Sequence, residues 1–193
     1  MTYSFTDLLA LLTLLVWPVI PLFWVPVHCK PDLFRRLGVF TYLVPFFSWV
    51  PVALLIYKTR ETILAYHVAM QLYINGMGVV LFALGAALQI WTLQLLTARV
   101  IMGMPEVMDT VKAGITRRGP FSRIRHPTYF SHTLMLAGVF FWTGSVGVGI
   151  ATVIDALVVN AVIIPLEERE LLKRFGAEYE KYCRDVPRRF LPW

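Results

Sequence analysis

The strongest constraint in this sequence is a series of long apolar runs, each close to the length that crosses lipid. A helix needs about 20 mostly apolar residues to span the hydrocarbon core of a bilayer. Such runs occupy residues 8–27, 39–57, 73–96, 128–142 and 148–166. The chain is 58% hydrophobic and 16% charged, whereas a soluble domain is about 45–50% apolar and about 25% charged. We therefore predict an all-α, polytopic membrane protein with about five transmembrane helices.

We expect residues 1–193 to form a single membrane domain. Residues 1–96 hold three N-terminal spans, and residues 97–193 hold a hydrophilic loop, a helical hairpin and a charged C-terminal tail. Because the segment before the first run lacks Lys and Arg, that run is interpreted as a retained span rather than a cleaved signal peptide. The glycine-rich segment 144–147 predicts a tight turn between the last two spans.

Proline and glycine positions predict local distortions and contacts. The first span contains Pro18, Pro21 and Pro26, which predict a kinked or unwound helix toward its end. The third span contains Gly76, Gly78 and Gly85, and small residues let transmembrane helices approach closely.

The basic residues predict the orientation of the chain. All of the 18 Lys and Arg residues except Lys58 and Arg60 fall in the first loop, the third loop or the tail. Lys and Arg favour the cytoplasmic side, so we expect the C-terminus to be cytoplasmic, in a bacterial inner membrane or the endoplasmic reticulum. Attraction to anionic lipid accounts for the basic excess without a nucleic acid, and no protein partner is evident.

The segment Arg125-His126-Pro127-Thr128-Tyr129 is the densest concentration of candidate chemistry. Proline is favoured in the first helical turn, so Arg125 and His126 are expected at the start of the fourth span. Free N–H groups and the helix dipole favour an anion at such a position.

Two acids are expected beside this segment. Glu167 and Glu168 follow the fifth span, and the hairpin brings that end next to His126. Together with the basic loop they could hold a cationic ligand or act as a general base. The alternative is a solvated helix start whose acids, including Glu170, pair with Lys173 and Arg174 four residues on.

Other polar and aromatic residues have two interpretations each. Asp155 lies within the fifth span, where it either lines a substrate cavity or pairs with another span. Tyr179, Tyr182, Phe190 and Trp193 either fold over the site or, more commonly, form an interfacial aromatic belt. Cys29 and Cys183 show no disulfide or metal-ligand pattern.

The ordered combination of RHPTY at 125–129, Glu167-Glu168, Phe175-Gly176, Tyr179, Tyr182 and Val186-Pro187-Arg188 resembles the isoprenylcysteine carboxyl methyltransferases and the related phospholipid methyltransferases. The resemblance covers roughly residue 106 to the C-terminus. It implies S-adenosylmethionine-dependent methyl transfer to a lipophilic acceptor that enters from the bilayer. No dinucleotide-binding or P-loop motif is present, so a cofactor site at the membrane surface is expected.

The resemblance also implies which residues form the site. Glu167 and Arg125 are the expected catalytic residues, with Arg125 holding the cofactor's carboxylate and Glu167 pairing with its positive end or taking a proton. The expected cofactor contacts are Glu106, Ala113, Gly114, Ile115, Thr116, Phe121, His126, Pro127, Thr128, Tyr129 and Glu167. No metal is expected.

The acceptor itself is left open. Eukaryotic isoprenylcysteine enzymes carry an arginine four residues before the equivalent of Glu167, where this chain has Ile163. Ser131 stands where a glycine is often found. The acceptor predicted from the sequence is therefore either a phospholipid amine or another apolar molecule with a carboxylate or thiol nucleophile.

Two other functions are compatible with the pattern. Membrane sterol reductases, which use NADPH, share an RHPxY-type motif and a tail similar to Lys181-Tyr182-Cys183 followed by Val186-Pro187. A non-catalytic membrane protein that binds lipid headgroups or a partner through its basic tail is the third possibility.

Overall fold

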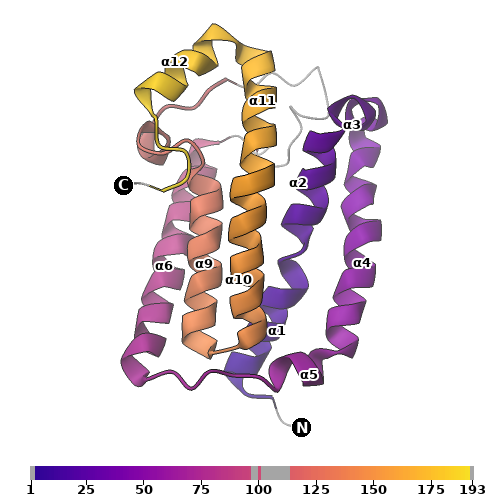
Figure 1. The fold of residues 1–193 in the computed structure, drawn as a ribbon, viewed down its shortest axis with the longest axis vertical. Coiled ribbons are helices and arrows are strands. Elements are labelled where there is room, and N and C mark those ends of the chain that lie inside the picture. The colour runs from indigo at the N-terminus through magenta and orange to yellow at the C-terminus, as the bar shows by residue number, and fades with distance from the viewer. Residues whose placement is uncertain (1–2, 97–99, 101–113, 192–193) are drawn as a thin grey trace.

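The computed structural model describes residues 3–96, 100 and 114–191. The described chain folds into a bundle of long helices, with α12 and the C-terminal tail at one end and the N-terminus at the other (Figure 1). Its elements are α1 (Phe5–Val16), α2 (Val19–Cys29), α3 (Pro31–Leu37), η1 (Gly38–Tyr42), α4 (Leu43–Lys58), α5 (Arg60–Leu64), α6 (Leu72–Leu95), η2 (Gly119–Ser122), α9 (Pro127–Thr143), α10 (Val146–Val158), η3 (Val159–Ile163), α11 (Ile164–Phe175) and α12 (Ala177–Asp185). The described residues contain no strand, which confirms the predicted all-α class.

Among the described residues, four helical stretches are long and apolar enough to cross a membrane. They are Phe5–Cys29, Pro31–Lys58, Leu72–Leu95 and Val146–Phe175. The fourth predicted span corresponds to α9, which is shorter at 17 residues and lies beside α6 and α10 (Figure 1). The protein is therefore a polytopic helical membrane protein, with α9 shielded by its neighbours.

The first span breaks where proline interrupts its hydrogen bonding. α1 ends at Val16 and α2 begins at Val19, with Trp17 and Pro18 between them. Proline lacks the N–H that would continue the ladder, so the predicted kink is confirmed. It falls in the middle of the span rather than toward its end, since Pro21 and Pro26 are accommodated within α2.

Glycines allow α6 and α9 to pack closely. A Cβ atom added at Gly78 would overlap the backbone of Phe141 and Trp142, and one at Gly85 would lie 2.8 Å from Met135 Cγ. These two predicted contacts are confirmed. Gly76 has no atom within 4 Å of such a Cβ, so its predicted contact is absent.

The C-terminal hairpin carries the chain back to the basic end. Gly144 ends α9 in the left-handed conformation, at φ 69°, which glycine adopts without strain. α10, the π-type turn η3 and α11 then form one continuous helical rod. This rod extends beyond the predicted end of the fifth span at residue 166, and its last part, α11, carries Glu167, Glu168 and Glu170. Gly176 ends α11 and separates it from α12.

Candidate active site

The start of α9 and the C-terminal tail are joined by backbone hydrogen bonds. Arg125 N donates to Arg188 O and His126 N donates to Arg189 O, each at 3.0 Å. The Arg125 side chain adds bonds from Nη1 to the carbonyl oxygens of Val186 and Pro187, at 2.8 and 2.9 Å. The tail is therefore fixed across the segment that precedes α9.

Arg125 also reaches α11 through Glu168. Its Nε and Nη2 atoms both lie 2.9 Å from Glu168 Oε1. Burial alone would lower the pKa of Arg125, but the hydrogen bond and charge of Glu168 raise it above its ordinary value. Arg189 Nη2 lies 2.6 Å from Glu168 Oε2, so Glu168 binds two arginines. It connects α11 both to the segment before α9, through Arg125, and to the C-terminal tail, through Arg189.

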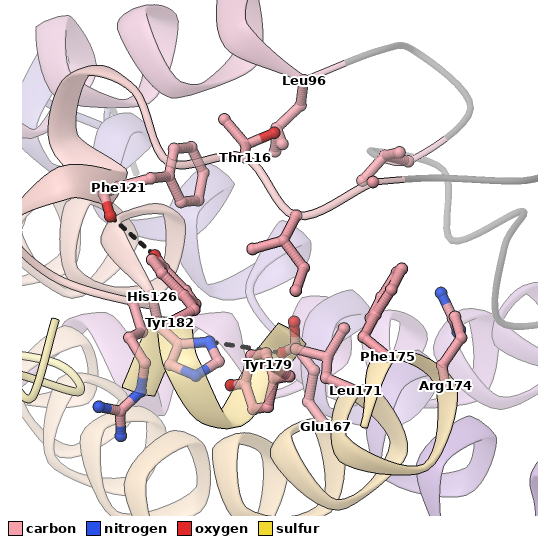
Figure 2. A pocket seen from close by; sticks show the side chains of 14 residues that line it. Leu96, Thr116, Phe121, His126, Glu167, Leu171, Arg174, Phe175, Tyr179 and Tyr182 are labelled. Carbon is pink, nitrogen blue, oxygen red and sulfur yellow. Dashed lines mark hydrogen bonds and ion pairs between the residues drawn. The ribbon is translucent and has the colours of Figure 1, made fainter. Parts of the chain in front are cut away.

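His126 lies between the two adjacent acids. Its Nε2 is 3.2 Å from Glu168 Oε1, and its Nδ1 is 3.7 Å from Glu167 Oε2. The His126 side chain is 4% exposed, and Figure 2 shows it turned toward Glu167. The expected proximity of His126 to these acids is therefore confirmed.

Glu167 differs from Glu168 in its surroundings. Within the described part of the chain, Glu167 Oε2 is buried without a hydrogen-bond partner. A buried carboxylate oxygen without a hydrogen-bond donor is costly, and the basic atom within ion-pair distance of this oxygen is His126 Nδ1, at 3.7 Å.

Two tyrosines from α12 fold over this region. The Tyr182 hydroxyl donates to Phe121 O at 2.7 Å (Figure 2). Burial raises the pKa of Tyr182 to about 12, and burial likewise raises the pKa of Tyr179. Both side chains are 3% exposed, so they form part of the site. The more common interpretation of them as an interfacial belt was wrong.

A first cavity, termed the tail cavity, lies beneath α11 and α12 and has a volume of about 110 Å³. Its walls are largely apolar, with the Tyr179 hydroxyl as a second buried polar atom that has no hydrogen-bond partner among the described residues. The residues that line only this cavity are Gly114, Ile115, Thr116, Leu171, Arg174, Phe175, Tyr179 and Tyr182; Figure 2 shows this arrangement.

A second cavity, termed the span cavity, runs between the helices and has a volume of about 360 Å³. It is lined by one face each of α2, α6 and α9. The residues that line only this cavity are Ile20, Trp24, Gln89, Leu93, Thr128, Tyr129, His132 and Met135.

The two cavities share a wall. Leu96, Val100, Phe121, Arg125, His126 and Glu167 line both of them. A ligand in the tail cavity and a ligand in the span cavity would therefore meet beside His126 and Glu167.

The structure divides the expected cofactor contacts between the two cavities. Gly114, Ile115 and Thr116 line only the tail cavity, and Thr128 and Tyr129 line only the span cavity. Phe121, His126 and Glu167 line both. Pro127 is buried at the start of α9 and lines neither. Glu106 and Ala113 lie outside the described residues, as does Trp193.

A second polar cluster ties the N-terminal helices to α11. Glu170 is 3.0 Å from His28 Nδ1, 3.3 Å from Arg35 Nη2 and 2.7 Å from Arg174 Nη2. The i,i+4 pair with Arg174 was expected, but Glu170 is buried rather than solvated. His28 stacks on Trp24, with ring centroids 5.3 Å apart, so this cluster supports a wall of the span cavity.

Comparison with known proteins identifies the class to which this arrangement belongs. The family model for phospholipid methyltransferases matches residues 73–178, more than half of the chain. The chain belongs to the phospholipid methyltransferase family. It is therefore a methyltransferase of a family that acts on lipid-like substrates, and the expected relationship is confirmed. No curated protein and no solved structure matches it.

The matched region of this methyltransferase includes α6, the hairpin and the start of α12, but not α1 to α5. Two residues of the span cavity, Ile20 and Trp24, come from α2. One wall of that cavity is therefore built by a part of the chain that the family match does not include.

Proposed function

We propose that this protein transfers a methyl group from S-adenosylmethionine to the nucleophilic head of a lipid that enters from the bilayer. The observation that carries the proposal is the shared wall between the tail cavity and the span cavity. Methyl transfer needs the cofactor and the acceptor to meet in one aligned geometry, and the shared wall is the place where ligands of the two cavities would meet.

The residues of the tail cavity fit this cofactor. Ile115, Phe121 and Phe175 offer apolar surfaces to an adenine ring. Two buried acceptors without hydrogen-bond partners among the described residues, Glu167 Oε2 and the Tyr179 hydroxyl, match the hydroxyl and ammonium donors of the molecule. When bound, S-adenosylmethionine supplies a methyl group whose bond to sulfur breaks as the acceptor's nucleophile takes the carbon.

The protein's own residues then have distinct tasks. Glu167 balances positive charge at the shared wall and accepts a proton if the nucleophile is an amine. His126 orients Glu167 from the start of α9, at 3.7 Å. The tail, fixed by Arg125, excludes water from the junction.

Arg125 contributes through the tail rather than by holding a carboxylate directly. Nε, Nη1 and Nη2 are all engaged by Glu168 and the carbonyl oxygens of Val186 and Pro187. We therefore assign it a positioning role. Its cluster lies at the basic end of the bundle, which we place on the cytoplasmic side.

The first test is equilibrium binding to the purified protein in detergent. S-adenosylmethionine, its demethylated product and NADPH are each titrated separately. Saturable binding that is lost in His126→Ala supports the proposal. His67→Ala is the matched control, because His67 lies at the opposite end, 3.4 Å from Asp7.

Two results contradict the proposal. Saturable binding of NADPH instead indicates reductase chemistry, and binding of neither compound indicates a non-catalytic protein. After a positive result, transfer of a labelled methyl group to extracted lipids identifies the acceptor.

A further inference from the structure

The span cavity carries a polar side chain well away from the shared wall. His132 lies six residues after His126 on α9, which is about 9 Å along a regular helix. Its neighbours along the cavity include the apolar side chains of Ile20, Leu93 and Met135. Ionisable groups inside a membrane bundle are costly and usually functional, so the presence of His132 here calls for a physical reason.

Asp155 on α10 lies behind His132. Its Oδ1 accepts from Trp17 Nε1 at 3.0 Å, and its Oδ2 accepts from Thr133 Oγ1 at 3.3 Å. His132 Nδ1 is 3.4 Å from the same Oδ2. Both carboxylate oxygens of Asp155 are therefore held by neighbouring side chains.

His132 is the basic side chain that faces Asp155. Asp155 is 2% exposed, and among the described residues His132 is the basic side chain within ion-pair distance of it. Because Nδ1 of His132 faces Asp155, Nε2 lies on the opposite side of the ring and is the nitrogen left for the cavity.

Gln89 on α6 adds a second polar side chain to the same cavity. Its side-chain amide is hydrogen-bonded by Ser131 of α9, and Gln89 lines the span cavity. An amide carries two N–H donors and one acceptor oxygen. Whichever way this amide is turned, at least one N–H remains for a ligand. Two polar side chains, His132 and Gln89, therefore line a stretch of cavity that is otherwise largely apolar.

We propose that His132, backed by Asp155, and Gln89 form a subsite that binds an oxygen atom of the lipid acceptor. This inference rests on the proposed function, because it takes the nucleophilic head to lie at the shared wall. The subsite then selects lipids with an ester, ether or hydroxyl oxygen about 9 Å behind the head. A lipid chain that is pure hydrocarbon at this depth offers His132 and Gln89 no polar partner, which disfavours its binding.

The test compares two lipids with the same phosphoethanolamine head. One has glycerol esters behind the head, and the other is a single alkyl phosphoethanolamine without glycerol. Their dissociation constants are measured in detergent at matched lipid mole fractions, with the protein saturated with S-adenosylhomocysteine. We expect the wild type to bind the glycerol ester about tenfold more tightly. His132→Leu and Gln89→Leu should each bring the ratio of the two constants toward one.

The matched control is His67→Leu, which removes a histidine at the same 3.4 Å distance from an aspartate but far from the span cavity. It should keep the wild-type ratio. Equal affinities in the wild type, or a tenfold ratio that survives in both His132→Leu and Gln89→Leu, overturn the subsite. Where His132→Leu does not fold, Gln89→Leu alone decides.

Cofactor binding separates this inference from the proposed function. His132 does not line the tail cavity, so His132→Leu should bind S-adenosylhomocysteine with wild-type affinity. Absence of cofactor binding in the wild type contradicts the methyltransferase mechanism. Normal cofactor binding together with equal affinities for the two lipids contradicts only the subsite.

Discussion

Arg125 and Glu168 form the central link of the site, with two guanidinium nitrogens of Arg125 within 2.9 Å of one carboxylate oxygen of Glu168. The same guanidinium holds the carbonyl oxygens of Val186 and Pro187. One side chain thus connects the start of α9, the end of the α10–α11 rod and the C-terminal tail. The position of the C-terminal tail and of α12 over the tail cavity depends on this connection.

Replacing Arg125 by lysine tests that dependence. Lysine keeps the charge but not the planar fork of donors, so it cannot satisfy the carboxylate and two carbonyl oxygens together. We expect S-adenosylmethionine to bind about tenfold more weakly and the peptide bonds near residue 186 to become sensitive to protease. Arg184→Lys on the exposed side of α12 is the control. Unchanged affinity and unchanged proteolysis in Arg125→Lys would show that the tail closes without this residue.

The role of Glu167 is tested by glutamine, which preserves shape and removes charge. Since Glu167 Oε2 is buried without a hydrogen-bond partner among the described residues, we expect cofactor affinity to fall by about tenfold to a hundredfold. Isothermal calorimetry measures the change. Glu178→Gln, which alters an exposed acid of α12 that pairs with Arg117, should bind normally. Full affinity and turnover in Glu167→Gln would remove Glu167 from the mechanism.

Much of the fold could be predicted from the sequence because lipid imposes simple rules. Residues 73–96 were expected to be helical, and α6 runs from Leu72 to Leu95. The juxtaposition of His126 and Glu167 was also predictable, because a tight turn at Gly144 forces two helices to return side by side. Hydropathy predicts where the helices lie, and the turn residues predict which helix ends meet.

The partners of buried polar groups could not be predicted in this way. Glu170 pairs with His28 and Arg35, more than a hundred residues earlier in the chain, and no local pattern encodes such a contact. His132 and Asp155 meet because α9 and α10 pack at one particular rotation. Two helices covered by apolar side chains of similar volume can pack at many rotations about their long axes. Hydropathy alone therefore does not determine which polar residues face each other.

The pH dependence of stability tests the burial of Tyr182. Burial raises the pKa of Tyr182 to about 12, from an ordinary value of 10.0. The folded protein therefore keeps this proton between about pH 10 and 12, while the unfolded chain releases it, so the stabilisation is complete below pH 10 and is lost as the pH rises. Tyr182→Phe should be less stable by about 1 kcal/mol below pH 10, because Phe121 O loses its donor.

The difference in stability between the wild type and Tyr182→Phe should shrink or reverse between pH 10 and 12. The phenylalanine variant has no proton to lose at this position. Thermal unfolding in detergent at several pH values measures this difference. Tyr73→Phe, at a side chain that is 71% exposed, should follow the wild type throughout. A constant difference between Tyr182→Phe and the wild type across this range would show that Tyr182 is not buried in the folded state.

Replacing Gly78 or Gly76 by alanine, which adds one methyl group at either position, tests the close approach of α6 and α9. In Gly78→Ala the new Cβ overlaps the backbone of Phe141 and Trp142, whereas in Gly76→Ala it meets no atom within 4 Å. Backbone cannot rotate away as a side chain can, so the helices must separate. We expect Gly78→Ala to lower the free energy of unfolding by about 1–3 kcal/mol.

Gly76→Ala should instead be neutral or stabilising by up to about 1 kcal/mol, because alanine has the higher helix propensity. Unfolding in a graded mixture of mild and denaturing detergent compares the two variants under identical conditions. Because α6 and α9 each supply a wall of the span cavity, Gly78→Ala should also weaken lipid binding more than it weakens cofactor binding. Equal stabilities of the two variants would contradict the close packing of α6 against α9.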